Sequence, residues 1–218
     1  FILPTMSLAG GELQIEDTLF DLKATSSCTG EVGVRGWTYK ETGLKHGGLD
    51  TPVPSVDIVL YQEKYKLKLK ATTSNENGQY RFCDVSGGNY LLVAQKQGYD
   101  DSKYRLTIRD EINYIPKGFS ASFAMYKTGK SPETNCKIEG DIIDSDDGDD
   151  IYPGNIKVQI IGIENKQRKK YTTDIDGSFE FEHLKPGTYK LIARKATWKF
   201  TKKIKLEKNM TYFLYMDW

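Results

Sequence analysis

The stretch "TTDIDGSFEFEHLKPGTYKLIARK" (residues 172–195) decides how the rest of the chain is interpreted. Its first half contains Asp174 and Asp176, two positions apart and followed by Gly177, as in a calcium loop or a tight turn. Aromatic residues then alternate with glutamates, a period of two that is typical of a strand with one buried face. The second half therefore predicts β-structure, whereas the first half fits either metal ligation or a turn.

An earlier stretch, "NENGQYRFCDVSGGNYLLVAQKQGY" (residues 75–99), matches residues 174–198 at a constant offset. Gly78 and Gly177, for example, are 99 positions apart. The segments upstream of both stretches match as well, and each half ends in an aromatic run, "FSASFAMY" and "MTYFLYMDW". Self-similarity at one offset predicts that a single domain occurs twice.

The earlier copy favours the turn interpretation of the opening stretch. It has Asn75 and Asn77 where the later copy has Asp174 and Asp176, and both copies keep the following glycine. Asn, Asp and Gly share the ability to form tight turns, because they tolerate positive φ and bond to their own backbone. We therefore expect a connection between two strands at this position.

Short alternating runs separated by turn residues recur along both copies. In "SVDIVLYQ", for example, Val56, Ile58 and Leu60 fall on one face. No long helical pattern interrupts these runs, so the sequence predicts an all-β fold of two tandem seven-stranded antiparallel β-sandwiches. We expect an N-terminal extension at residues 1–27 that could add a strand to a neighbouring sheet, a first sandwich at 28–127, a linker at 128–135 and a second sandwich at 136–218.

A longer motif runs through each copy. In the second it comprises Gly140, Ile142, Gly148, Ile156, Thr173, Asp176, Gly177, Phe179, Phe181, Leu184, Gly187, Tyr189 and Leu191. This pattern resembles the carboxypeptidase regulatory-like domain, a transthyretin-like, Ig-like sandwich; the first copy departs from it with Asn77 where Asp is usual. The resemblance implies a non-catalytic module that serves as a spacer, an adhesive unit or a site for partner proteins.

The Cna-B domains of pilins are similar and carry a Lys–Asn isopeptide bond. The resemblance implies an acidic proton shuttle about four residues after the strand tyrosine, where this chain has Ala94 and Ala193. An isopeptide is therefore disfavoured, although Lys137 and Asn209 are expected on neighbouring strands.

The bulk composition excludes several functions. The chain carries 31 basic and 30 acidic residues, a net charge of +1. This balance argues against a nucleic-acid binder, and no run of about 18 apolar residues predicts a membrane-spanning helix. The basic runs at 166–170 and 195–208 are interpreted as solvated strand faces in preference to a polyanion site.

No catalytic constellation is apparent. The two histidines are His46, in a glycine-rich segment, and His183, near a strand end, and neither has an evident partner. The run "DSDDGDD" presents Asp144, Asp146 and Asp149 as candidate calcium ligands, although an acidic solvated loop is the favoured interpretation. We expect no other cofactor.

The cysteines and one sequon suggest covalent modifications. Cys28 and Cys83 fall in the same half and are a candidate disulfide in a secreted protein, which would leave Cys136 unpaired; three free thiols are the alternative. Asn209-Met210-Thr211 is a glycosylation sequon.

These observations favour a non-enzymatic structural or adhesive protein that is extracellular or on the cell surface and contacts partner proteins or copies of itself. One alternative is a carbohydrate-binding appendage of a larger secreted enzyme, with aromatic faces such as Tyr39, Tyr61, Tyr99 and Tyr126. The other alternative is a calcium-dependent adhesin that uses the acidic run.

Overall fold

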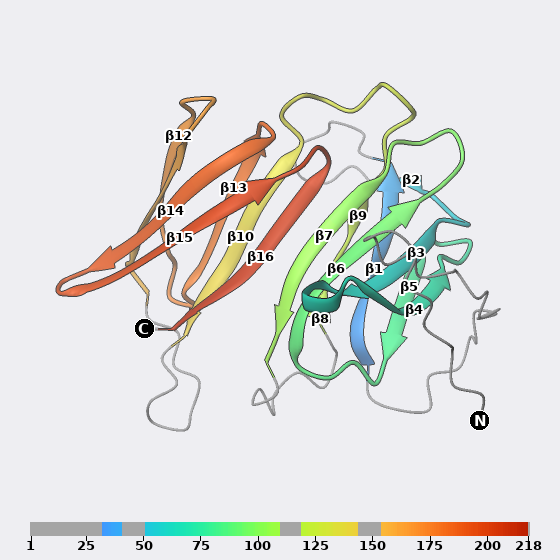
Figure 1. The fold of residues 1–218 in the computed structure, drawn as a ribbon, viewed down its shortest axis with the longest axis horizontal. Coiled ribbons are helices and arrows are strands. Elements are labelled where there is room, and N and C mark those ends of the chain that lie inside the picture. Colours follow the sequence, from blue (N-terminus) through green and yellow to red (C-terminus); the bar gives the residue numbers. More distant parts are fainter. Residues whose placement is uncertain (1–31, 41–50, 110–118, 144–153, 218) are drawn as a thin grey trace, which may run out of the picture.

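The computed structural model describes residues 32–40, 51–109, 119–143 and 154–217. The fold is all-β apart from one short 3-10 turn, η1 (Glu63–Tyr65), and forms two β-sandwiches, which confirms the predicted fold class (Figure 1). The first sandwich contains β1 (Val32–Lys40), β2 (Thr51–Pro52), β3 (Asp57–Gln62), β4 (Leu67–Thr73), β5 (Gln79–Cys83), β6 (Gly88–Gln95), β7 (Ser102–Ile108), β8 (Phe119–Ser120) and β9 (Phe123–Ala124). The second contains β10 (Cys136–Ile143), β11 (Lys157–Gly162), β12 (Arg168–Thr172), β13 (Ser178–Leu184), β14 (Gly187–Lys195), β15 (Trp198–Leu206) and β16 (Met210–Asp217).

The two sandwiches repeat one pairing scheme, as the internal repeat predicted. β1 pairs with β5 as β10 pairs with β13, and the chain β4-β3-β6-β7 corresponds to β12-β11-β14-β15. Most neighbours are antiparallel, but the last strand of each sandwich adds in parallel: β8 and β9 lie beside β1, and β16 lies beside β10. β16 is unbroken, whereas its counterpart in the first sandwich is two short pieces.

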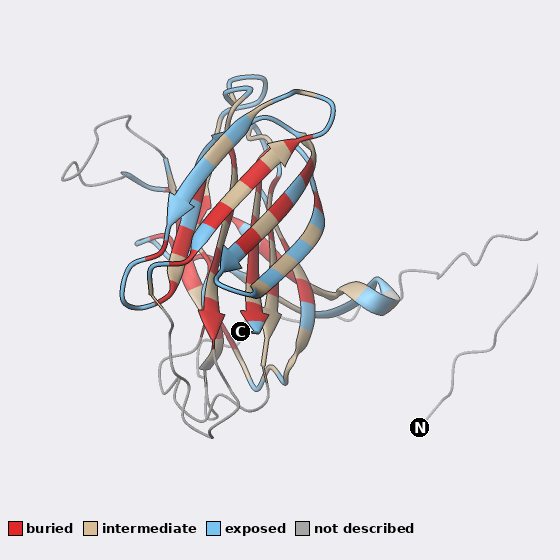
Figure 2. Ribbon diagram, turned by 90° about the vertical axis from the view of Figure 1, so that its left-hand side faces the viewer, coloured by how far each residue is buried: buried red, intermediate tan, exposed pale blue. Residues whose placement is uncertain are grey.

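Alternating burial along the strands produces one core per sandwich, visible as red bands between pale blue ones in Figure 2. Val56, Ile58 and Leu60 are all fully buried, as their spacing predicted. Core 1 is the apolar cluster of the first sandwich, including Val34, Leu92 and Leu106. Core 2 is the cluster of the second, including Ile138, Leu191 and Ile204.

One glycine in each sandwich allows the last strand to approach closely. A Cβ on Gly36 would collide with the carbonyl oxygen of Ala121, and a Cβ on Gly140 would collide with that of Leu214. The two glycines occupy equivalent places in β1 and β10, so the parallel addition of the last strand depends on the same missing side chain in both copies.

A single sheet passes through both sandwiches. Its seven strands follow the order β13-β10-β16-β7-β6-β3-β4, so three strands of the second sandwich continue into four strands of the first (Figure 1). Tyr104 on β7 packs in core 1, whereas Tyr212 on β16 packs in core 2. The shared sheet therefore carries core 1 on one face and core 2 on the other.

Candidate functional site: the junction between the sandwiches

The two sandwiches meet where β16 adds in parallel to the edge of β7. Lys103, Tyr104 and Arg105 stand opposite Met210, Thr211 and Tyr212. The backbone N–H of Lys103 donates to the carbonyl of Asn209 at 2.9 Å, just before β16 begins. Strand addition gives the junction directional backbone bonds and a fixed register.

Asn209 is a buried polar residue at the centre of the junction, with 7% of its surface exposed. Its side-chain amide donates to the carbonyl of Asp101 at 2.9 Å, and its side-chain oxygen accepts from the amide of Asn135. Its φ of 57° lies in the left-handed region, where Asn is among the few residues readily tolerated. One side chain thus ties together the first sandwich, the linker and the second sandwich.

Asp100 holds the linker against the first sandwich. Its carboxylate accepts bonds from the Ser131 hydroxyl at 2.5 Å, the Gly129 amide at 3.1 Å and the Lys208 ammonium at 3.3 Å. These partners, Ser131 first, lower the pKa of Asp100 to about 2. The carboxylate is therefore charged at neutral pH and organises the turn that leads into β10.

Charged side chains flank the shared strands. Lys103 forms an ion pair with Glu207, and this contact lowers the pKa of the Glu207 carboxyl. Arg105 pairs with Glu63 at 2.6 Å, and its guanidinium lies 5.4 Å from the ring centroid of Tyr212. Cation–π and ion-pair contacts of this kind favour one orientation of the two sandwiches.

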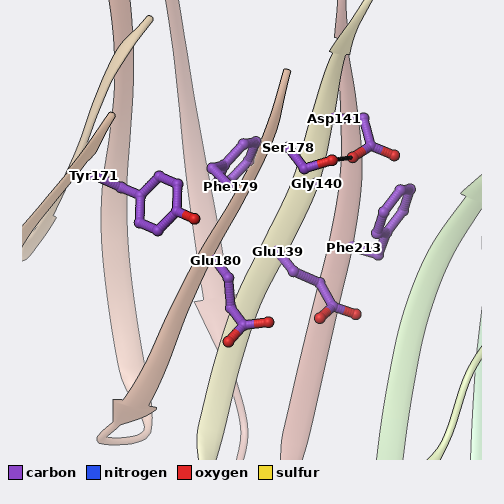
Figure 3. A pocket seen from close by; sticks show the side chains of 8 residues that line it. All are labelled: Glu139, Gly140, Asp141, Tyr171, Ser178, Phe179, Glu180 and Phe213. Atoms are coloured by element: carbon purple, nitrogen blue, oxygen red, sulfur yellow. Dashed lines mark hydrogen bonds between the residues drawn. The ribbon is translucent and has the colours of Figure 1, made fainter. Parts of the chain in front are cut away.

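A groove of about 320 Å³ lies on the outer face of the second sandwich, beside the junction (Figure 3). It is lined by Glu139, Gly140, Asp141, Tyr171, Ser178, Phe179, Glu180 and Phe213. Phe213 belongs to β16 but packs against Phe119 of core 1, with ring centroids 4.6 Å apart. The groove is therefore acidic and aromatic, and one wall contacts the first sandwich.

The acidic groups of the groove are neutralised within the protein. Lys137 reaches Glu139 at 2.7 Å and Glu180 at 2.6 Å. Burial disfavours the charged form of Lys137, but these two carboxylates outweigh burial and raise its pKa. The hydroxyl of Tyr104 donates to Glu139 across the junction.

Asp141 is the exception, because no cation pairs with it among the described residues. Burial raises the pKa of its carboxyl, and the Ser178 hydroxyl donates to it at 2.8 Å, the bond drawn in Figure 3. The groove thus presents an acceptor and aromatic rings, but within the described residues no group of three or more His, Cys, Asp or Glu side chains could hold a metal ion.

The stretch that begins with Asp174 forms a turn, as predicted. The Asp174 carboxylate accepts from the amides of Asp176 at 3.0 Å and Ser178 at 3.3 Å, and Gly177 has a φ of 68°. Asn75 makes the same two bonds in the first sandwich. The Asp174 carboxylate therefore accepts its hydrogen bonds from backbone amides of the same turn.

Several predicted sites lie outside the described residues. These are the candidate calcium ligands Asp144, Asp146 and Asp149, together with His46, Cys28 and the N-terminal extension, and the calcium site stays a prediction. Cys83 is disulfide-bonded and Cys136 is a buried free thiol, whereas the pairing of Cys83 with Cys28 stays a prediction.

The remaining predicted sites can be placed. Lys137 faces its glutamates while Asn209 bonds in the junction, so the two candidate isopeptide partners belong to different clusters. Glycosylation of Asn209 stays a prediction; in the folded junction this side chain is buried and its amide donates to the carbonyl of Asp101. His183 is the penultimate residue of β13 and has a φ of 55°, and its carbonyl accepts from the side-chain amide of Gln167.

Sequence reasoning missed the junction itself. It treated residues 128–135 as a linker and Asn209 as a sequon or an isopeptide partner, and it assigned no role to Asp100 or Asp101. The available signals were the Asp100-Asp101 pair before β7, Asn135 before β10 and Asn209 before β16. Such residues are so frequent in turns that their long-range partners could not be inferred.

The comparison with protein families resolves the nature of the repeat. One family model, described as BOS complex subunit NOMO1-like, second beta sandwich domain, matches the chain twice, at residues 36–119 and 136–211. The chain belongs to this family. The two matches fall on the two sandwiches. No helix in the described part of the chain is long and apolar enough to span a membrane.

Individual relatives are distant. The chain is 25% identical over 176 residues to Colossin-A of Dictyostelium discoideum; the match covers 74% of this chain and only 2% of that protein. Among solved structures, the GBS52 minor pilin of Streptococcus agalactiae is 12% identical with a TM-score of 0.34, covering 84% of this chain and 94% of the pilin. The shaft pilin SpaA of Lactobacillus rhamnosus GG is 10% identical with a TM-score of 0.35, covering 87% and 98%. Similarities this low carry no conclusion about function.

Proposed function

We propose that the chain is a non-enzymatic structural unit in which two sandwich modules act as one rigid body. It would contribute to a stalk, a surface coat or an assembly through contacts with proteins. The observation that carries this proposal is the seven-stranded sheet that continues from one sandwich into the other. A linker alone would allow independent motion, whereas a shared sheet fixes orientation and transmits force along hydrogen bonds.

The chemistry of the groove supports a non-catalytic role. Lys137, Glu139 and Glu180 are paired with one another, and Ser178 donates to Asp141. A nucleophile needs an adjacent base that is itself oriented by a third group. The paired side chains of the groove serve instead to stabilise the outer face of the second sandwich.

The proposal includes an extracellular or surface location and a carboxypeptidase regulatory-like type of sandwich. The disulfide at Cys83 supports an oxidising compartment. Differential alkylation of the native protein, followed by mass spectrometry, tests this part. Recovery of Cys83 as a free thiol would contradict it.

Residual dipolar couplings test the proposed rigidity. We expect the amides of both sandwiches to fit one alignment tensor, because β7 and β16 hold them in a single sheet. Two tensors of clearly different magnitude would show independent modules and overturn the proposal. A variant with Asn209→Gly, which loses the central side chain of the junction, provides the loosened reference.

Carbohydrate binding is a second candidate, favoured by the groove. Tyr171 is 37% exposed and lines the groove together with the carboxylate of Asp141, and sugars bind where ring faces and hydrogen-bond acceptors occur together. A glycan array with the wild type and Tyr171→Ala tests it. Equal signals from the two proteins would exclude this groove as a sugar site.

A further inference from the structure

β15 is the repeat equivalent of β7, and it forms the edge of its sheet. Leu106 of β7 stands opposite Tyr90, and Ile204 of β15 stands opposite the equivalent Tyr189. By this register Thr201 corresponds to Lys103. The outer side of β7 is occupied by β16, whereas in the described part of the chain no strand pairs with the outer side of β15.

The backbone of β15 is oriented to receive a strand. The N–H of Lys103 points away from β6 and donates to the carbonyl of Asn209. Because antiparallel strands alternate the direction of their amides, the equivalent N–H of Thr201 points away from β14. An edge with outward amides is a template for strand addition.

The charge of β15 indicates what would bind there. Lys199, Lys203 and Lys205 are exposed along it, so two β15 edges would repel each other. In the existing junction the basic residue Lys103 forms an ion pair with Glu207 of the second sandwich. By the same logic, carboxylates on the incoming module would pair with the lysines of β15.

One position further restricts the occupant. Tyr104 donates to Glu139 across the existing junction, and the register places Lys202 at the position of Tyr104. The first sandwich of another copy would bring Arg35 to the position of Glu139 and so place two cations together. A sandwich with a carboxylate at that position would instead form an ion pair with Lys202.

We propose that β15 is the docking edge for a further sandwich module of this family, which adds its last strand in parallel and carries a carboxylate at the position of Glu139. The second sandwich of this chain is itself a module of this type, although its own last strand is already bound to β7. This inference rests on the proposed structural function, since it extends the same junction by one module.

The test appends a second copy of residues 126–218 directly after Trp218 of the full chain, which keeps the spacing of the existing linker. Tyr104 stands opposite Thr211 in the existing junction, and Lys202 is the equivalent of Tyr104. Lys202→Cys is therefore combined with Thr211→Cys in the appended copy. The resulting protein is treated with a short bifunctional thiol reagent. We expect cross-linking at least about tenfold faster than in a matched control with Lys199→Cys, because docking raises the effective concentration of one pair only. Equal rates for the two pairs, with the appended module folded by circular dichroism, would overturn the proposal.

A backbone variant provides a second readout. Thr201→Pro removes the outward amide of β15 without removing a bond to β14, so it should reduce cross-linking to the control rate, whereas Thr201→Val should not. Cross-linking that is unchanged by Thr201→Pro would contradict strand addition. Dipolar couplings of the unextended chain report on the proposed rigidity separately, so failure of the docking edge and failure of the structural function are distinguishable.

Discussion

The two sandwiches have corresponding apolar cores but carry opposite charges at one equivalent place on their outer faces. On the outer face of the first, Arg35 stands opposite Arg81; at the equivalent place in the second, Glu139 stands opposite Glu180. Like charges directly opposite one another are unfavourable, and in the second sandwich Lys137 relieves the repulsion. The repeat therefore preserves what packs in the cores and varies what contacts other surfaces.

The edge strands differ in the same way. β7 and β15 occupy equivalent places, but β7 is covered by β16 and β15 lies at the edge of its sheet. The difference follows from position in the tandem array rather than from the fold. Substitutions at the junction can therefore test whether β7 and β15 differ only because β16 covers β7.

The largest expected effect comes from truncating equivalent core residues. Leu92→Ala and Leu191→Ala, each at a fully buried position, should each cost about 2–5 kcal/mol. Because a shared sheet couples the sandwiches, calorimetry should show one transition that shifts downward with either substitution. Two transitions would contradict the coupling if only the melting temperature of the substituted sandwich changes.

Substitution of Gly36 or Gly140 should distinguish the role of the last strand in one sandwich from its role in the other. Gly36→Ala and Gly140→Ala each force the last strand away and should cost about 1–3 kcal/mol, as overpacking does. Only Gly140→Ala displaces β16, the strand that bonds to β7, so only this variant should accelerate exchange of the Lys103 amide. Similar exchange in both variants would show that β16 does not carry the junction.

Asn209→Gly removes the central side chain of the junction while keeping the left-handed backbone accessible. We expect a loss of about 1–2 kcal/mol, since Asp101 and Asn135 lose their hydrogen-bond partner. Chemical denaturation measures this loss. The neighbouring Lys208→Ala, which removes an exposed ion pair, should change stability much less.

The smallest effect concerns pH. The folded pKa of Asp100 is about 2, below the ordinary value of 3.8, so its contribution to stability is present above pH 3.8 and is lost as the pH falls through 2. The wild type should melt above Asp100→Asn at pH 6, and the difference should disappear near pH 2. A difference that grows on acidification would have the wrong sign.

The sequence predicted the repeat, the cores and the turns because these depend on local periodicity and on residues with special backbone preferences. Asn75 and Asp174 were interpreted correctly since an Asx turn is completed within a few residues. The junction was not predictable, because Asn209 and Asp101 are far apart in the sequence and their contact depends on how two finished sandwiches meet. No local pattern encodes that the last strand of one copy adds to the other.

Amide hydrogen exchange of Lys103, compared with Thr201, tests the shared sheet most directly. The Lys103 N–H is bonded to Asn209, whereas the equivalent N–H of Thr201 points to the side of β15 that no described strand pairs with. We predict slow exchange at Lys103, comparable with the strand amides between β10 and β16, and fast exchange at Thr201. Equally fast exchange at both amides would show two sandwiches connected only by their linker and would contradict the continuous sheet.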